Sequence, residues 1–229
     1  MNSTVDPQSL SLEAQAVMNQ RLTYLSAEKM QRLEATARQV LDAGVMGNIL
    51  EFGVALGGSA IVLSRIAQTN NRHFHGFDLF GLIPEPASDQ DDKKSKQRYR
   101  VIASGKSRGI DGDLYYGYRK DLFKDVCDAF NRHGMPVDGS NVTLHKGLFQ
   151  DTWNSYQGGA VAFAHLDCDW YEPVKFCLAS LVASIPVGGG IVLDDYNDYQ
   201  GCRTATNEFV AAHPDFTFDA GANAILRRT

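Results

Sequence analysis

The chain has 229 residues, of which 44% are hydrophobic and 21% charged, and its formal net charge is −5. This length allows a single domain, residues 1–229, with a substantial buried core, and the acidic balance argues against a nucleic-acid partner, which needs a basic face. No apolar run approaches the roughly 20 residues that span a bilayer, and the first residues lack the features of a signal peptide. We therefore expect a cytoplasmic protein with no membrane partner and no nucleic-acid partner. Its cysteines show no CxxC spacing and are expected to be reduced core residues: Cys127, Cys168, Cys177 and Cys202.

Residues 10–44 have a helical pattern and form most of a predicted N-terminal helical cap, residues 1–46. Ser26 is placed to cap a helix, and Leu25 and Met30 occupy the two positions of a hydrophobic staple. Apolar residues then recur on one face, and Gly44 is placed to end the helix.

From residue 48 the pattern alternates between strands and helices. Apolar strand-like runs cover residues 48–52, 73–77, 141–145, 160–166 and 190–193. Helix-like runs begin near Ser59, Asp121, Pro173 and Arg203, and two last strands at 216–218 and 223–226 are close enough to form an antiparallel pair. Strands separated by helices imply a parallel sheet covered on both faces. The sequence therefore predicts an α/β fold: a Rossmann-like, doubly wound, mostly parallel seven-stranded sheet with an antiparallel C-terminal hairpin.

Residues 84–119 interrupt this alternation with a polar, charged segment that has no clear period. A solvated surface loop is one interpretation. However, a connection this long within a compact domain is uncommon and is often a lid or binding loop. Its end carries Tyr115, Tyr116 and Tyr118, which can close over a ligand. We therefore expect a lid or substrate insertion.

The first strand ends in a glycine-bearing turn, "ILEFGVALGGSA", which includes Glu51, Gly53, Gly57 and Ser59. In doubly wound sheets this turn is the usual place for a nucleotide, because glycines allow close approach and a helix begins with free N–H groups. The spacing is GxxxGG and not the GxGxxG of dinucleotide enzymes. Glu51 would repel a phosphate but suits a cationic ligand that bears a sulfonium and an ammonium group. A turn that serves packing alone is the alternative.

The second strand ends at Asp78, and an acidic residue at this place typically accepts hydrogen bonds from ribose hydroxyls. Ribose, adenine and a positively charged amino-acid tail together describe S-adenosylmethionine better than NAD.

Two later strands also end in carboxylates. Asp167 follows "VAFAHL", and Asp194 and Asp195 follow "GGGIVL". Carboxylates that repel one another beside an apolar interior require a positive partner, and three of them beside a ligand crevice form an all-oxygen site for a hard cation such as Mg²⁺. The alternative is that these residues cap helices or are solvated.

A different metal site is suggested by His165 and Asp167, whose HxD spacing occurs in non-haem iron proteins. Those sites usually lie in all-β barrels, whereas this chain alternates strands with helices. A histidine packed against a neighbouring helix is therefore the favoured interpretation.

Together these motifs resemble the macrocin O-methyltransferase family, whose members use S-adenosylmethionine to methylate sugar hydroxyls of natural products. The resemblance covers residues 49–209, and Ile83, Cys168 and Trp170 depart from the family pattern near the acceptor. The matching segments are "LEFGVALGGSA", "FDLFGLIP", "GLFQDTW", "HLDCDWYEP" and "GGGIVLDDYNDYQGCRTATNEF".

The resemblance implies a class I methyltransferase fold, a small hydroxylated acceptor and a role for each matching residue. Asp78 would bind the ribose, and Phe149 and Gln150 would lie around the adenine. Asp167 would be both the catalytic base and a metal ligand. The methionine part would be held by the turn residues Glu51, Gly53, Gly57 and Ser59, and the divalent metal by Asp167, Asp194 and Asp195.

Three other functions are compatible with parts of the sequence. A catechol or phenol O-methyltransferase would use the same cofactor and metal. An NAD-dependent oxidoreductase or epimerase needs a Tyr-x-x-x-Lys pair, for which Tyr116 and Lys120 are the match, outside the expected helix. A binding protein without turnover has no reason to keep three repelling carboxylates. The acceptor, the choice of divalent metal and whether the chain forms a homo-oligomer stay open.

Overall fold

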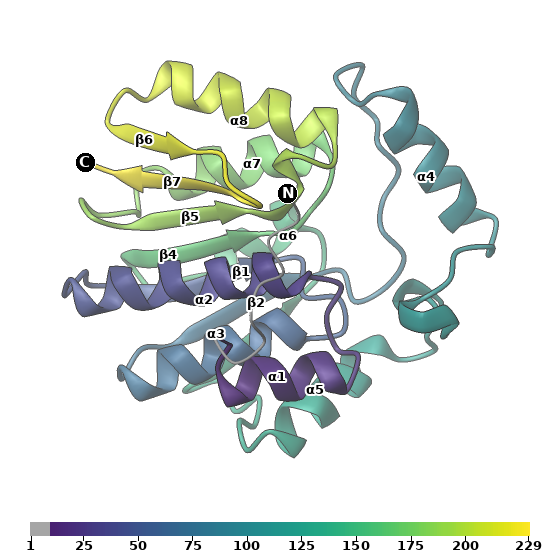
Figure 1. The fold of residues 1–229 in the computed structure, drawn as a ribbon, viewed down its shortest axis with the longest axis horizontal. Coiled ribbons are helices and arrows are strands. Elements are labelled where there is room, and N and C mark those ends of the chain that lie inside the picture. Colours follow the sequence, from purple (N-terminus) through teal and green to yellow (C-terminus); the bar gives the residue numbers. More distant parts are fainter. Residues whose placement is uncertain (1–9) are drawn as a thin grey trace.

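A computed structural model describes residues 10–229, so residues 1–9 of the predicted N-terminal cap lie outside it. The described chain forms one seven-stranded sheet in the order β3-β2-β1-β4-β5-β7-β6 (Figure 1). β7 is antiparallel to β5 and β6, and the other pairs are parallel. The predicted fold is thus confirmed. The strands are β1 (Asn48–Phe52), β2 (Phe74–Asp78), β3 (Val142–Lys146), β4 (Val161–Leu166), β5 (Gly190–Leu193), β6 (Phe216–Asp219) and β7 (Ala224–Arg228).

Helices cover both faces of the sheet (Figure 1). One apolar cluster joins α1, α2, α3 and α5 to the face that carries Ile49, and another joins α7 and α8 to the face that carries Leu50. Adjacent strand residues point to opposite faces, and each fully buried aliphatic side chain contributes about 1.5–3 kcal/mol. The helices are α1 (Leu12–Asn19), α2 (Ala27–Asp42), α3 (Gly58–Thr69), α4 (Lys93–Ala103), α5 (Leu122–Arg132), α6 (Phe149–Thr152), α7 (Tyr171–Leu181) and α8 (Gln200–Ala212). None of the helices of residues 10–229 is long and apolar enough to cross a membrane.

The strand order fixes where a ligand binds. From β1 the chain adds β2 and β3 on one side, then places β4 and β5 on the other side. The order therefore reverses between β1 and β4, and in such sheets the crevice lies beyond the carboxyl ends of these two strands. The first residues of that crevice are Gly53 and Asp167.

The predicted N-terminal helical region consists of two helices, α1 and α2. Ser11 and Ser26 cap them, since each hydroxyl accepts a hydrogen bond from the backbone N–H three residues later. Gly44, with φ of 76°, follows the end of α2 as predicted. Glycine adopts this left-handed backbone conformation at little cost in free energy, because it has no Cβ atom.

The segment of residues 84–119 contains a helix, α4, which the sequence analysis did not recognise. Asp92 caps α4 by accepting from the N–H of Ser95 at 2.8 Å. The helix lacks an apolar period because it buries little besides Ser95 and Ile102, and its straight Lys, Gln and Arg side chains favour helix on their own. Figure 1 shows α4 standing away from the sheet, beyond the carboxyl ends of the parallel strands.

Candidate active site

The turn after β1 packs directly on the chain that leaves β4. Gly53 has φ of 95°, and a Cβ atom on it would lie 1.8 Å from the carbonyl oxygen of Asp167. The N–H of Asp167 in turn donates to the carbonyl of Phe52 at 2.8 Å. Only glycine fits this position, because any side chain would collide with backbone atoms. Gly57 and Gly58 are further along the turn, and Gly58 packs on the carbonyl of Leu22.

Asp78, the last residue of β2, stabilises that turn. One carboxylate oxygen accepts from the backbone N–H groups of Val54 and Ala55 at 2.7 and 2.9 Å, and the other accepts from Phe80 N–H at 2.5 Å. Burial raises the pKa of Asp78, although these hydrogen bonds oppose the shift. The oxygen bonded to Phe80 keeps a free acceptor position, because a carboxylate oxygen has two lone pairs.

Glu51 does not reach the crevice. Its side chain and that of His165 are both fully buried, and the Glu51 carboxylate lies 2.7 Å from Nδ1 of His165 across β1 and β4. Glu51, Gly57 and Ser59 line neither of the two cavities described below. His165 therefore pairs with Glu51 inside the sheet and takes no part in the acidic cluster, whose members in residues 10–229 are all aspartates.

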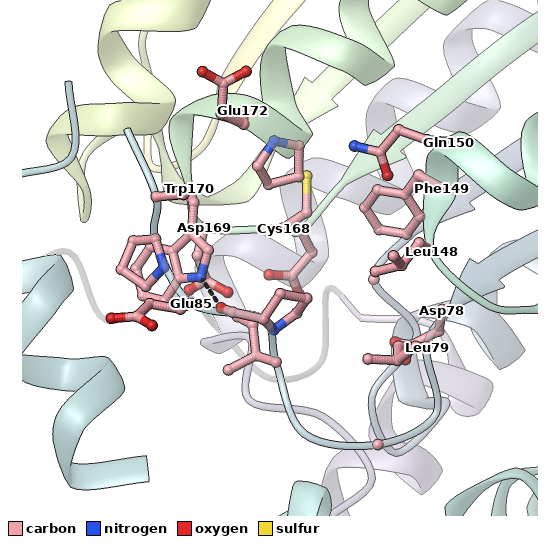
Figure 2. Close-up of a pocket in the computed structure, with 18 of the residues that line it drawn as sticks. Asp78, Leu79, Glu85, Leu148, Phe149, Gln150, Cys168, Asp169, Trp170 and Glu172 are labelled. Carbon is pink, nitrogen blue, oxygen red and sulfur yellow. Dashed lines mark hydrogen bonds between the residues drawn. The ribbon is translucent and has the colours of Figure 1, made fainter. Parts of the chain in front are cut away.

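A cavity of about 480 Å³ opens beside Gly53 and Asp78. Figure 2 shows Asp78, Phe149 and Trp170 among the residues around it. Phe149 and Gln150 line it from the segment after β3, and Trp170 closes the other side, held by its indole N–H on the carbonyl of Pro84 at 3.0 Å. We call this the cofactor cavity.

The residues of the cofactor cavity fit S-adenosylmethionine. A Cβ atom on Gly81 would meet nothing within 4 Å, so the backbone leaves room for a ligand there. The amide of Gln150 is exposed and makes no hydrogen bond with the described part of the chain, so it is free to pair with an adenine edge. The apolar lining with an acid at one end suits adenosine.

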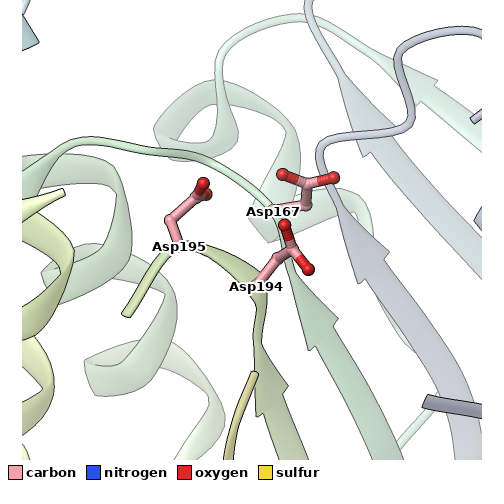
Figure 3. Close-up of side chains that lie close together, drawn as sticks. All are labelled: Asp167, Asp194 and Asp195. Carbon is pink, nitrogen blue, oxygen red and sulfur yellow. The ribbon is translucent and has the colours of Figure 1, made fainter. Parts of the chain in front are cut away.

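Three predicted acids do come together. Asp167 follows β4, and Asp194 and Asp195 form the 3₁₀ turn that follows β5, η5 (Asp194–Tyr196). One oxygen of each lies within 4.8 Å of the others (Figure 3). Burial, followed by the repulsion of neighbouring aspartates, raises the pKa of both Asp167 and Asp195.

The donor set of this cluster fits a hard divalent cation. Oδ1 of Asp194 is buried without a hydrogen-bond partner among the described residues, whereas Oδ2 of Asp195 accepts from the N–H of Asp169 at 2.9 Å. An orphaned buried carboxylate oxygen costs free energy, and oxygen ligands are those that Mg²⁺ prefers.

Asp169 is a further acid beside the cluster, and it sits in the left-handed region with φ of 57°. Burial, and then the charge of Asp194, raises its pKa to about 7. A non-glycine residue held in this conformation is uncommon and concentrates at functional sites. No role was predicted for Asp169 from the sequence.

Lys29 on α2 supplies a positive charge that the sequence analysis missed. Its ammonium group donates to the carbonyl and Oδ2 of Asp194 at 3.0 and 2.9 Å and to Asp198 at 2.7 Å. Burial by itself lowers the pKa of this group, but the two carboxylates raise it overall. No local motif marks a lysine 165 residues away from its partner. Asp194 therefore has a built-in cation as partner in addition to any metal.

A second cavity, of about 300 Å³, is lined by all three acids of the cluster, and we call it the acceptor cavity. Its residues shared with the cofactor cavity are Gly53, Asp78, Ile83, Tyr116, Asp167, Asp169 and Trp170. The rest of its lining comes from the segment before α2, α2 itself, the turn after β1, α4, the insertion and the segment after β5: Tyr24, Leu25, Lys29, Ala55, Lys94, Arg98, Ile102, Tyr115, Asp194, Asp195, Asp198 and Tyr199.

A model of one protein family, described as macrocin O-methyltransferase, matches residues 13–216. A rhamnosyl-tetracenomycin C 4'-O-methyltransferase of Streptomyces olivaceus is 26% identical over 211 residues, covering 89% of this chain and 72% of that protein. Demethyldecarbamoylnovobiocin O-methyltransferase of Streptomyces niveus is 24% identical, covering 82% of this chain and 68% of that protein.

Solved structures share the fold. The O-methyltransferase NovP superposes with a TM-score of 0.72 at 23% identity, covering 90% of this chain and 82% of that one. The O-methyltransferase TomG of Streptomyces achromogenes, solved in complex with S-adenosylmethionine, gives a TM-score of 0.57 at 15% identity, covering 100% and 92% of the two chains.

Proposed function

The chain belongs to the macrocin O-methyltransferase family and is an O-methyltransferase, and from that premise we propose that it methylates a sugar hydroxyl of a natural product, with S-adenosylmethionine as donor and a divalent cation such as Mg²⁺ as cofactor. The observation that carries this proposal is the convergence of Asp167, Asp194 and Asp195: all three line the acceptor cavity, and Asp167 also lines the cofactor cavity. Methyl transfer requires the donor and the acceptor hydroxyl to come into contact, and the place where the two cavities adjoin allows this.

The names of the relatives support a sugar as the acceptor. One is a 4'-O-methyltransferase of a rhamnosyl-tetracenomycin, and another, from Micromonospora griseorubida, is a mycinamicin III 3''-O-methyltransferase that is 23% identical and covers 83% of this chain and 71% of that protein. The acceptor cavity of this chain, with aromatic side chains and carboxylates, has the surfaces that bind a sugar ring.

For the donor, we assign the adenine to Phe149 and Gln150, the ribose to Asp78 and the methionine part to Gly53. Glu51, Gly57 and Ser59 then shape the turn from behind and do not touch the ligand. The donor brings an already activated methyl group, so the protein contributes orientation and exclusion of water, and good positioning is worth about 7–11 kcal/mol of the barrier.

Asp167 is the proposed base, since it lines both cavities. Its carboxylate takes the proton of the acceptor hydroxyl while the oxygen forms a bond to the methyl carbon. The carbon–sulfur bond breaks, leaving a methyl ether and S-adenosylhomocysteine. Asp167, Asp194 and Asp195 would hold the divalent cation, which when bound lowers the pKa of a coordinated hydroxyl.

Two measurements test the proposal. Titration calorimetry with S-adenosylmethionine is expected to show binding, and absence of binding at millimolar ligand would reject the donor. Methyl transfer to a panel of glycosides is expected to depend on Mg²⁺ and to be lost in Asp194→Ala/Asp195→Ala. Undiminished turnover in EDTA would count against the metal.

A phenol or catechol acceptor is the second candidate, because Tyr116 and Trp170 line both cavities and offer an aromatic slot. Including catechols in the acceptor panel decides between the two. The oxidoreductase alternative lacks support, since Tyr116 lies in the short 3₁₀ helix η3 (Tyr116–Tyr118) and Lys120 is exposed outside both cavities.

A further inference from the structure

Helix α4 is the most basic of the helices and strands in residues 10–229, although the protein as a whole is acidic. Its 11 residues, KKSKQRYRVIA, include five lysines and arginines and no acid, whereas the whole chain has a net charge of −5. Lys94, Arg98 and Ile102 follow the i, i+4, i+8 spacing that places side chains on one helix face. All three line the acceptor cavity, which Asp194 and Asp195 also line.

The charges of this face are not neutralised by ion pairs. Within residues 10–229, no carboxylate oxygen lies within 4.0 Å of the charged groups of Lys94 and Arg98, although Lys29 in the same cavity has two such partners. Lys94 instead donates to the backbone carbonyl of Asp198, and Arg98 donates to the hydroxyl of Ser107 at 2.9 Å. Both groups are thus held in place by neutral oxygens and keep their positive charge available.

Aromatic rings flank the two cations. The ammonium of Lys94 lies 4.9 Å from the ring centre of Tyr199, and the guanidinium of Arg98 lies 5.6 Å from that of Tyr115. Tyr199 in turn packs edge to face on Trp170 at 5.0 Å. Such contacts fix the position of a cation at little cost and leave its outer N–H groups free for a ligand.

We propose that Lys94 and Arg98 bind an oxyanion of the acceptor, so that the substrate class is a sugar that carries a phosphate ester or a carboxylate. The arginine fork and the lysine ammonium are the usual ligands of such groups. The cations and the carboxylates of this cavity then orient the acceptor: its anion contacts α4, and its hydroxyl faces Asp167. In the reverse orientation the anion would meet the aspartates, which costs free energy through repulsion. The assignment of the anion to the acceptor rests on the proposed function. The existence of an anion site at Lys94 and Arg98 is independent of it.

A competing explanation is that Lys94 and Arg98 only hold α4 against the acidic wall. Binding separates the two explanations without any turnover. We compare wild type, Lys94→Gln/Arg98→Gln and the control Arg100→Gln, which removes the same kind of charge from an exposed position of the same helix outside both cavities. Each protein is passed over a chelating resin, and its melting temperature is measured with pyrophosphate, with malonate, and with sodium chloride at equal ionic strength.

The expected result is that pyrophosphate or malonate raises the melting temperature of wild type and Arg100→Gln above the sodium chloride value, and that Lys94→Gln/Arg98→Gln loses this increase. An increase with pyrophosphate alone indicates that the acceptor carries a phosphate ester, and an increase with malonate alone indicates a carboxylate. An equal increase in all three proteins, or none in wild type, overturns the proposal. If the double variant does not fold, the two single variants are expected to lose part of the increase each, and unchanged increases in both overturn the proposal as well.

Kinetics add a second test. With a nucleoside-diphosphate deoxyhexose as acceptor, Lys94→Gln/Arg98→Gln is expected to raise KM by about tenfold or more, the effect of losing charged hydrogen bonds. The uncharged methyl glycoside of the same sugar is expected to show no change. Equal losses with both acceptors favour the holding role and overturn the proposal. If neither sugar is methylated by wild type, the proposed acceptor class fails, while the binding result still decides the anion site.

Discussion

The two cavities that meet at Asp167 are built in different ways. The cofactor cavity is lined by residues at the carboxyl ends of the parallel strands, such as Gly53, Asp78 and Asp167, and by residues 84–87, Asp91 and Tyr116 of the insertion. The acceptor cavity takes Lys29 from α2, Arg98 from α4 and other residues from parts of the chain outside the sheet. Both cavities thus use the carboxyl ends of the strands and the insertion, but of the two only the acceptor cavity takes residues from α2, from α4 and from the segment after β5. Variants can test this division.

The largest effect is expected for Asp167→Asn, at the shared wall. An amide cannot take the hydroxyl proton, so kcat is expected to fall by about 10²–10⁴-fold, the usual contribution of a general base. The donor contacts stay in place, so the Kd for S-adenosylmethionine, measured by calorimetry, is expected to change little. A variant that loses donor binding to the same extent as turnover would show that the two cavities are not separable here.

Gly53→Ala is expected to damage both cavities through the fold. The new Cβ atom would lie 1.8 Å from the Asp167 carbonyl oxygen at a positive φ, so the free energy of unfolding is expected to fall by about 3 kcal/mol or more. Urea unfolding measures this. Gly81→Ala is the control, because its Cβ atom has open space and no positive φ is recorded for it. Equal stability of the two variants would contradict the close backbone contact.

Lys29→Met is expected to affect the acceptor side alone. It removes a largely buried cation from Asp194 and Asp198, so the free energy of unfolding is expected to fall by about 1–3 kcal/mol, with donor affinity unchanged. Mg²⁺ is expected to stabilise this variant more than wild type, because the ion replaces the lost charge, and Lys29→Arg should keep most of the stability. An unchanged unfolding curve for Lys29→Met would mean that the pair contributes nothing.

The smallest effect is expected for Gln150→Ala, on the cofactor side alone. Loss of one hydrogen bond to the adenine is expected to weaken S-adenosylmethionine binding by about three- to tenfold, with no change in stability because the side chain is exposed. Asn154→Ala is a matched exposed control. Equal affinities of the two variants would place the adenine away from Gln150.

Much of this architecture was predictable from local patterns. The strands were placed to within one or two residues, and the Ser26 cap and the stop at Gly44 were correct, because burial period and capping are properties of neighbouring residues. Helix α4 was not predicted because it buries only Ser95 and Ile102, so its sequence shows no repeating apolar positions. Its polar sequence is helical through propensity and the Asp92 cap, which leave no apolar period.

The sequence alone determined the sheet, the glycine turn and the set of acids at the ends of the strands, because each depends on residues that are close along the chain. Only the tertiary structure decided that Glu51 pairs with His165, that Lys29 pairs with Asp194, and that the basic face of α4 lines the same cavity as the aspartates. These are contacts between residues far apart in sequence. Their partners are selected by the packing of helices and loops around the sheet, and a local pattern carries no information about that packing.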